Sequence, residues 1–169
     1  MSFAIQIRLA ERNDLPQINA IYNWAVLHTV ATFDMEERPL SSAEQWFAVH
    51  QDQFYPLYVA VVDGQVVGWG SLSPFHPRPA YRLTGEFSIY IAAEKQGKGI
   101  GNALLSTLCS CAEELGYRSL MGLITATNIA SLRLAEKYGF VPVGHYREVG
   151  RKFEQWLDVR VVQKMLKGS

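Results

Sequence analysis

The sequence predicts a single mixed α/β domain whose central sheet is mostly antiparallel and flanked by helices. Stretches with the period of a β-strand are interspersed along the chain with stretches that have the period of a helix. Two strand-like runs flank an Asp-Gly dipeptide at 63–64, which is the signal of an antiparallel hairpin. The 169 residues are 49% hydrophobic, enough for one sizeable core, and no linker or repeat divides them. We therefore expect one domain over residues 1–169.

The first two elements follow from their hydrophobic periods. Residues 3–10, "FAIQIRLA", alternate apolar and polar side chains and predict a half-buried strand. Residues 13–27, "NDLPQINAIYNWAVL", carry apolar residues at helical spacing, with Asn13 or Asp14 as the N-cap.

A second helix and a hairpin come next. Residues 41–50 open with Ser41 and Glu44 at the spacing of a capping box, which predicts the start of a helix. Residues 57–73 predict the two strands of the hairpin. Residues 74–81, "PFHPRPAY", are too rich in proline for the interior of a strand or helix and predict a loop.

The middle of the chain predicts a strand, a helix and another strand. Residues 81–92, "YRLTGEFSIYIA", resume the strand pattern. Residues 100–116 form an amphipathic helix that Gly116 closes at the C′ position. Residues 119–126, "SLMGLITA", form the next strand.

The last third of the chain predicts a short helix and a second pair of strands. The helix covers residues 128–139 and ends at Gly139. Residues 140–150 and 152–166 form the two strands, with a turn around Gly150-Arg151.

Charge and composition exclude several classes of protein. Lys and Arg together number 16, as do Asp and Glu, so there is no electrostatic reason to expect nucleic acid or an acidic membrane as a partner. No apolar run approaches the length of a membrane span, and the N-terminus lacks the pattern of a signal peptide. Cys109 and Cys111 lie two apart in a helix, where they cannot pair, so we expect reduced thiols and a cytoplasmic protein. The four histidines have no ligand spacing, and we expect no metal.

A glycine-rich stretch, "EKQGKGIGNALL" at residues 94–105, precedes the helix that begins near residue 100. It is not a P-loop, because Lys98 is followed by Gly99 instead of Ser or Thr, and its glycine spacing does not match the dinucleotide fingerprint. Such a turn can present free N–H groups to an anion at the helix start. It can equally be a turn that permits close packing. Spacing alone leaves both interpretations open.

Two motifs resemble the GNAT superfamily of N-acetyltransferases. "SIYIAAEKQGKGIGNALL" resembles the acetyl-CoA motif of that superfamily, a strand followed by a Q/R-x-x-G-x-G/A turn and a helix, with matches at Gln96, Gly99 and Gly101. "NIASLRLAEKYGF" resembles a later motif, through Asn128, Ser131, Tyr138 and the Gly-Phe pair at 139–140. The order of elements over nearly the whole chain also fits, so the resemblance implies the GNAT fold.

Three other stretches resemble one branch of that superfamily, the phosphinothricin and methionine sulfoximine acetyltransferases. They are "AIYNWAV" with "TVATF", "RPAYRLTGEFSIY", and "GRKFEQWLDV". The chain departs from the pattern of that branch at Leu83, Gly85 and Phe87, where an aromatic residue, a valine and a polar residue are usual. These departures leave the reaction intact and bear on the choice of substrate.

The resemblance implies two catalytic residues. Glu86 would bind the substrate ammonium and accept its proton, and the hydroxyl of Tyr138 would protonate the leaving thiolate. A strand glutamate is otherwise commonly solvated or ion-paired, and the alternative for Tyr138 is a core residue that packs against Phe140. Strand alternation would place Glu86 on one face with residues 82, 84, 88 and 90.

The resemblance further implies how acetyl-CoA, the expected cosubstrate, is held. Backbone groups of Ile89 and Ile91 would pair with the pantetheine amides, and residues 97–102 would hold the pyrophosphate. Asn128 would bond to the pantetheine arm, or cap its helix, or both. For Lys98 and Lys137, a solvated lysine is the alternative. The full set expected at acetyl-CoA is Ile89, Tyr90, Ile91, Gln96, Gly97, Lys98, Gly99, Ile100, Gly101, Asn102, Asn128 and Lys137.

A small amino-acid-like substrate is the expected acceptor. Arginine forks suit a carboxylate or phosphinate, so Arg82 beside Glu86 would clamp an α-amino acid by its two charged groups. The alternative for the arginines is an exposed loop position. The residues expected at the substrate are Phe33, Arg78, Tyr81, Arg82, Glu86 and Lys152, with a neighbouring subunit as a further candidate for the wall.

The expected function is acetyl transfer from acetyl-CoA to the α-amino group of a compound such as methionine sulfoximine, methionine sulfone or phosphinothricin. Two alternatives stay open: acetylation of a protein N-terminus or another amine, and a non-catalytic module that binds acyl-CoA. The resemblance also implies a homodimer.

Overall fold

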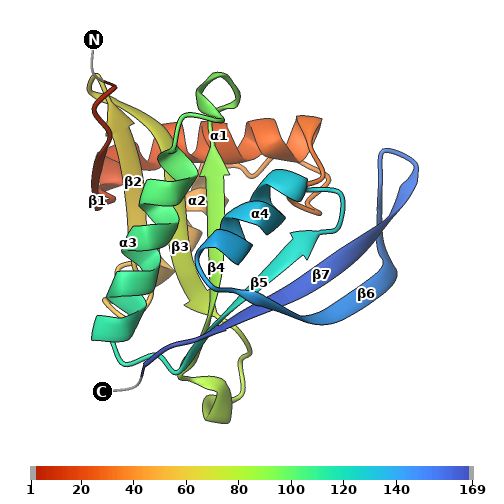
Figure 1. Ribbon diagram of the computed structural model, residues 1–169. Helices are drawn as coiled ribbons and strands as arrows, with labels where there is room; N and C mark the ends of the chain where they lie inside the picture. Colours follow the sequence, from red (N-terminus) through yellow and green to blue (C-terminus); the bar gives the residue numbers. More distant parts are fainter. Residues whose placement is uncertain (1–2, 168–169) are drawn as a thin grey trace.

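Seven strands form one sheet in the order β1-β2-β3-β4-β5-β7-β6 in the computed structural model, which describes residues 3–167 (Figure 1). Only β4 and β5 pair in parallel, so the mixed, mostly antiparallel sheet is confirmed. The strands are β1 Gln6–Leu9, β2 Leu57–Val62, β3 Gln65–Pro74, β4 Thr84–Ile91, β5 Ser119–Thr125, β6 Val141–Lys152 and β7 Gln155–Met165. The helices are α1 Leu15–His28, α2 Leu40–Val49, α3 Ile100–Glu114 and α4 Ile129–Lys137, with short 3-10 turns at Arg12–Asp14, Pro79–Tyr81 and Ala93–Lys95.

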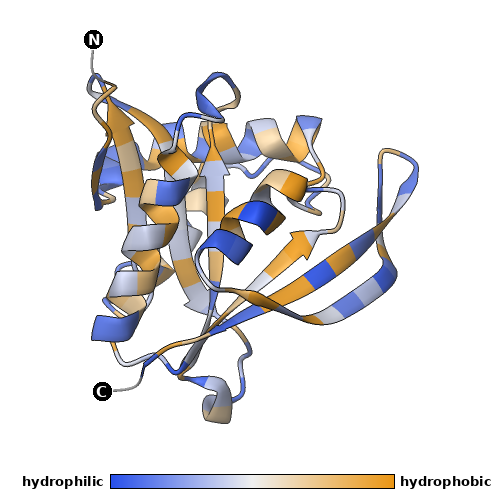
Figure 2. Ribbon diagram, viewed as in Figure 1, coloured by the Kyte–Doolittle hydropathy of each residue, from blue (hydrophilic) through white to orange (hydrophobic). Residues whose placement is uncertain are grey.

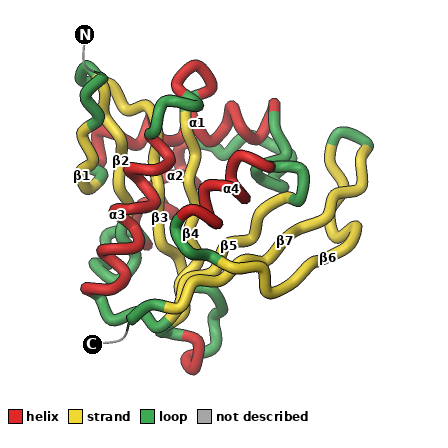
Figure 3. Tube along the Cα trace, in the orientation of Figure 1, coloured by secondary structure: helices red, strands yellow, loops and turns green. Residues whose placement is uncertain are grey.

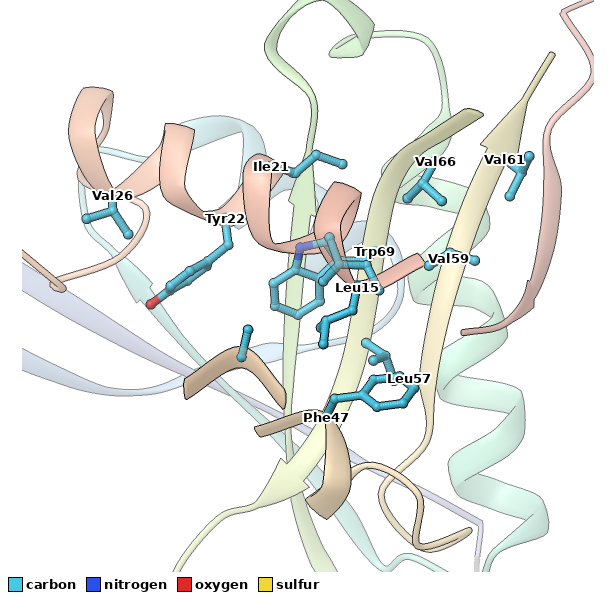
Figure 4. Packing of buried hydrophobic residues seen from close by; sticks show 12 residues of the cluster. Leu15, Ile21, Tyr22, Val26, Phe47, Leu57, Val59, Val61, Val66 and Trp69 are labelled. Atoms are coloured by element: carbon cyan, nitrogen blue, oxygen red, sulfur yellow. The ribbon is translucent and has the colours of Figure 1, made fainter. Parts of the chain in front are cut away.

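Helices cover both faces of the sheet. Helices α1 and α2 lie behind it and α3 and α4 in front, while the β6–β7 hairpin extends beyond the body as an arm (Figures 1 and 3). The core behind the sheet gathers around Trp69, which Figure 4 shows between Tyr22 of α1 and Phe47 of α2. The core in front joins Leu105 and Leu108 of α3 to Leu120 of β5. Hydrophobic residues follow the central strands, and hydrophilic ones gather on the side of α4 toward the viewer in Figure 2. Among the helices of residues 3–167, none is long and apolar enough to cross a membrane.

Several local predictions are confirmed. Asp63 and Gly64 have φ of 49° and 75°, the left-handed pair of a type I′ turn, between β2 and β3. Gly116 and Gly139 have φ of 82° and 86°, and each terminates its helix as the C′ residue of a Schellman motif. Asn128 caps α4, since its side chain accepts a hydrogen bond from the backbone N–H of Ser131.

The start of α2 differs from the prediction, whereas α1 has the predicted N-cap residue without the side-chain capping bond. Helix α2 begins one residue before Ser41, because the extended Pro39 is the N-cap and its carbonyl accepts the first bond, so the capping box does not form. Asp14 occupies the N-cap of α1 but makes no side-chain cap. Its carboxylate instead accepts two hydrogen bonds from Arg8, at 2.7 and 2.9 Å.

Two strand boundaries also differ. Pro79 starts a 3-10 turn, and Arg82 caps it in a helical backbone conformation, so β4 begins at Thr84 instead of residue 81. The last hairpin turns at Phe153 and Glu154, with φ of 50° and 61°, and Gly150 lies inside β6. Neither turn residue is a glycine. The turn was predicted three residues too early because Gly150 is the residue type that turns favour.

The buried Asp14 supports a prediction about stability. We expect Asp14→Asn to lower the free energy of unfolding by about 2 kcal/mol at pH 7, because it breaks a two-bond ion pair and weakens the bond from the Glu11 N–H. The Arg8 ion pair lowers the pKa of Asp14, so the contribution is complete above the ordinary aspartate pKa and is lost as pH falls through the lowered value. Urea unfolding at pH 7 and pH 3 measures both effects.

The matched control is Glu44→Gln, which removes an ion pair with Arg12 whose side chains are 50% and 77% exposed. We expect a change below about 0.5 kcal/mol there. A loss of stability for Asp14→Asn that persisted undiminished at pH 3 would contradict the role of the charge.

Candidate active site

The sheet splits between β4 and β5. The two strands pair only where residues 84–86 lie beside residues 119–121, and the remainder of β4 pairs with β3 alone. The last backbone hydrogen bond between the β4 segment and β3 joins the N–H of Ala92 to the carbonyl of Val67. Antiparallel strands alternate, so the backbone groups of Ile89 and Ile91 face away from β3 toward the split. The side-chain amide of Gln96 donates to the carbonyl of Ile91 from that side, at 3.4 Å.

A cavity of about 610 Å³ occupies this split. Its walls come from β4, β5, the start of α4, the loop after α1 and the arm strand β6. Eight of the residues expected at the site line it, and Glu86 is the only charged residue among the described residues of its wall. These eight are Phe33, Glu86, Ile89, Tyr90, Ile91, Gln96, Gly97 and Asn128.

Glu86 has the properties of a base. Burial raises the pKa of its carboxyl group above the ordinary value. No hydrogen bond or ion pair engages that carboxylate within residues 3–167. A half-buried carboxylate with no partner attracts an ammonium group, and its raised pKa suits it to accept a proton from one.

The glycine-rich turn has features that fit both interpretations left open by the sequence. Gly97 and Gly99 have φ of 74° and 83°, and a Cβ on either would meet no atom within 4 Å, so they supply a left-handed backbone beside open space. Gly101 is needed for packing instead, because its Cβ would lie 3.1 Å from Cδ2 of Leu134 in α4. Gly99 is the N-cap of α3 and has no side chain to cap it. The first N–H groups of α3 are therefore open to an anion.

Three more residues expected at acetyl-CoA, Lys98, Ile100 and Lys137, lie outside the cavity wall, whereas Asn128 lines it. Ile100 is fully buried in the core, and Lys98 lies 5.7 Å from the ring centre of Phe3. Lys137 donates to the side-chain oxygen of Asn102 at 2.6 Å, which joins α4 to the first turn of α3. Asn128 lines the cavity with its Oδ1 already engaged as the cap of α4.

Tyr138 does not line the cavity. Its hydroxyl donates to the carbonyl of Asn102 at 3.0 Å, a second tie between α4 and α3. The ring packs against the core that contains Phe140.

The arginines expected at the substrate lie outside the wall of the cavity that Glu86 lines. Arg82 precedes β4, so strand alternation does not place it on the face of Glu86, and that inference was wrong. Its guanidinium lies over the ring of Phe54, 4.7 Å from the ring centre. Tyr81 lies against His76, with ring centres 4.5 Å apart, and Arg78 is exposed in the same loop. None of these three lines the cavity.

Lys152 is buried beneath the cavity wall instead of lining it. Its side chain donates to the backbone carbonyl of Thr32 at 2.8 Å, and the residue is 2% exposed. Thr32 and Phe33 belong to the loop after α1 and do line the cavity.

Tyr146 and Val149 form the arm side of the cavity and were not among the residues predicted from the sequence. The register between β6 and β7 shifts between residues 146 and 150, and Glu148 has φ of 49°. This bulge brings residues of both parities to one face. The carboxylate of Asp158 stabilises it by accepting bonds from the N–H of Glu148 at 2.8 Å and from His145 at 2.7 Å. Only an aspartate opposite the bulge, in the partner strand, hints at it in the sequence.

The unusual residues of β4 are explained by packing. A Cβ on Gly85 would lie 2.9 Å from Cε1 of Tyr117, so a valine does not fit there. The ring of Phe87 occupies the space above Gly122, whose Cβ would lie 2.6 Å from Cε1 of that ring. Each large ring thus lies against a glycine on the neighbouring element.

Comparison with known proteins agrees with this geometry. A family model described as an acetyltransferase (GNAT) domain matches residues 7–161. A Salmonella typhimurium protein named L-methionine sulfoximine/L-methionine sulfone acetyltransferase is 35% identical over 160 residues, which cover 95% of this chain and 94% of that protein.

Two solved structures share the fold. A GNAT superfamily phosphinothricin acetyltransferase from Sinorhizobium meliloti, in complex with acetyl-CoA, has a TM-score of 0.94 at 34% identity, covering 98% of this chain and 93% of that one. A ribosomal-protein-alanine N-acetyltransferase from Brucella melitensis has a TM-score of 0.92 at 39% identity, covering 95% and 99%.

Proposed function

The chain belongs to the GNAT family of N-acetyltransferases, and we propose that it transfers an acetyl group from acetyl-CoA to the α-amino group of a small amino-acid-like substrate. The observation that carries the proposal is the unpartnered carboxylate of Glu86, the only charge among the described residues of the cavity wall. The relatives named for methionine sulfoximine, methionine sulfone and phosphinothricin supply the substrate class. These three compounds are the leading candidates.

The residues of the split fit acetyl-CoA. The open backbone edge at Ile89 and Ile91 can pair with the two amides of the pantetheine arm, as an added strand would. The left-handed turn at Gly97 and Gly99 and the open N–H groups of α3 suit the pyrophosphate. The N–H₂ of Asn128 donates to no acceptor within residues 3–167 and is available to the pantetheine arm.

The catalytic step then needs little from the protein beyond positioning and one base. Acetyl-CoA supplies the acetyl group as a thioester. Glu86 binds the substrate ammonium and takes its proton, directly or through water, which frees the nitrogen lone pair. A backbone N–H on the open edge of β4 polarises the thioester carbonyl, which the freed nitrogen attacks. The C–N bond forms as the C–S bond breaks, and CoA leaves as a thiolate that takes the second proton lost by the nitrogen. The base and that edge belong to one strand, which holds both reactants at a fixed separation.

A second candidate is acetylation of a protein N-terminus, which one specific observation favours. No cation is found among the described residues that line the cavity, and a peptide N-terminus brings an ammonium without a nearby carboxylate. The similar Brucella melitensis protein is named for such a reaction.

Release of free thiol from acetyl-CoA distinguishes these functions. We expect turnover with one or more of methionine sulfoximine, methionine sulfone and phosphinothricin, and at least tenfold lower kcat/KM with peptides that end in alanine or serine. The reverse order would establish the second candidate. Tight binding of acetyl-CoA with no thiol release by any amine would indicate a binding module.

The general-acid role predicted for Tyr138 is not part of this proposal, because its hydroxyl is engaged outside the cavity. We expect Tyr138→Phe to keep kcat within about threefold and to lower the free energy of unfolding by about 1 kcal/mol, the value of one lost hydrogen bond. Steady-state kinetics and urea unfolding measure the two. A loss of more than tenfold in kcat together with a changed alkaline limb of the pH profile would restore the catalytic role.

The homodimer stays a prediction. Exposed apolar side chains on the arm, Val149, Phe153 and Trp156, are candidates for such an interface. Sedimentation at micromolar concentration tests it, and a monomer would remove it.

A further inference from the structure

The loop after α1 is tied to three separate strands. Three successive backbone carbonyls, those of residues 30, 31 and 32, each accept a hydrogen bond from a side chain on a different strand of the sheet. The donors are Thr125 of β5 to Val30 at 2.6 Å, Tyr90 of β4 to Ala31 at 3.3 Å, and Lys152 of β6 to Thr32 at 2.8 Å. This loop carries Thr32 and Phe33, which form the wall of the cavity that also holds Glu86.

Lys152 is the unusual member of the three. It is 2% exposed, and Thr32 O is the one hydrogen-bond acceptor that its ammonium has in the described part of the chain. It lies 5.3 Å from the ring centre of Phe153, and the carboxylate of Asp34 contributes a favourable field. A lysine without an ion-pair partner is costly to bury. The burial of Lys152 is therefore best explained by the need for a long side chain that donates to the carbonyl of Thr32.

The same strand makes room for the next residue of the loop. Gly150 of β6 lies directly against the ring of Phe33, and a Cβ on Gly150 would overlap that ring, with Cδ2 at 2.6 Å. The glycine admits the ring, and the lysine two residues later holds the carbonyl that immediately precedes Phe33. Both contacts place the ring at the cavity.

We infer that Lys152 is a positioning residue, which fixes Phe33 as the wall against which the acceptor substrate packs opposite Glu86. The inference rests on the proposed function. The arm strand β6 thereby sets the shape of the acceptor side, whereas the backbone edge and the turn expected at acetyl-CoA belong to β4 and the start of α3.

Lys152→Met tests this, because it keeps the length of the side chain and removes the donor. We expect the KM for the acceptor to rise at least tenfold, with kcat within about threefold and the KM for acetyl-CoA within about twofold, since an apolar wall contributes binding that is equal in ground and transition states. Lys164→Met is the matched control: its ammonium also donates to a backbone carbonyl, that of Tyr138, away from the acceptor wall. We expect both KM values to be unchanged there.

A double-mutant cycle shows whether Lys152 acts through Phe33. Phe33→Ala should raise the acceptor KM by itself, and adding Lys152→Met to it should change that KM by less than about twofold. A full additional rise in the double variant would overturn the inference, as would an unchanged acceptor KM in Lys152→Met.

A second variant covers the case in which Lys152→Met does not fold. Gly150→Ala displaces the Phe33 ring without burying an unpaired group, and we expect the same rise in acceptor KM.

Hydrogen exchange supplies a readout that needs no substrate. The amides of Ala31 and Asp34 are bonded to the hydroxyls of Thr29 and Thr32, and they should exchange at least tenfold faster in Lys152→Met than in the wild type or in Lys164→Met. If no amine is acetylated, the proposed function fails, and faster exchange still shows that Lys152 holds the loop. Unchanged exchange would overturn the inference whatever the substrate.

Discussion

Replacing Glu86 with glutamine is expected to lower kcat about 10²–10⁴-fold, the range that a positioned general base contributes. Glutamine has nearly the same shape and still reaches the cavity, but it neither attracts an ammonium nor accepts its proton. The KM for acetyl-CoA should stay within about twofold, because the open edge of β4 and the glycine turn are untouched. Steady-state thiol release measures both values.

The pH dependence identifies the base. Burial raises the pKa of Glu86, so the carboxylate is protonated and inactive at low pH, and kcat/KM rises as pH passes upward through that raised value. In Glu86→Gln this limb should disappear, leaving only the dependence that comes from the substrate amine. Glu113→Gln, at an exposed position of α3, is the control and should match the wild type. Full activity of Glu86→Gln across pH would show that water alone accepts the proton.

The parts of the candidate site that could be predicted from the sequence are those whose residues lie close together along the chain. Glu86, the open edge at residues 89–91 and the turn at 96–99 lie in one stretch of about fifteen residues, so a single motif fixes their mutual positions. The structure keeps them in order along one strand and the turn that follows it. The relative positions of these residues could therefore be predicted without knowledge of distant contacts.

The acceptor side could not be predicted in that way, because it is assembled from remote segments. Phe33 reaches the cavity through a carbonyl held by Lys152, 120 residues away in the chain. Tyr146 and Val149 reach it through a bulge that Asp158 stabilises from the partner strand. The prediction that Arg82 shares a strand face with Glu86 was wrong for a local reason. Pro79 starts a 3-10 turn, and strand alternation begins only at Thr84. Patterns of period two or 3.6 contain none of this information.

The residues of β4 that depart from the family pattern also could not be interpreted from the sequence of that strand alone. A glycine at 85 and an aromatic ring at 87 look like changes of substrate specificity when the strand is considered alone. In the structure each is one half of a packing pair, Gly85 with Tyr117 and Phe87 with Gly122. Phe87 also lines the cavity, so its ring links the packing of the sheet to the shape of the site.

Gly122→Ala is therefore expected to damage both stability and activity. The new Cβ would lie 2.6 Å from Cε1 of Phe87 and 2.9 Å from Cγ2 of Val162. The Phe87 ring also packs against Phe140, with ring centres 4.9 Å apart. Overpacking of this kind costs about 1–3 kcal/mol. Because Phe87 lines the cavity, a shift of its ring changes the shape of the site, so we expect at least a tenfold loss in kcat/KM. Urea unfolding and thiol release measure the two effects.

A double variant separates overpacking from any other effect of the alanine. Phe87→Leu removes the ring atoms that meet the new Cβ, so Gly122→Ala combined with Phe87→Leu should recover at least half of the lost stability, although Phe87→Leu alone leaves a small void and destabilises the protein. The two substitutions are in contact, and their effects should be strongly non-additive with a favourable coupling. Simple additivity would show that the side chain of Val162, whose Cγ2 would lie 2.9 Å from the same Cβ, and not the ring of Phe87, resists a side chain at 122.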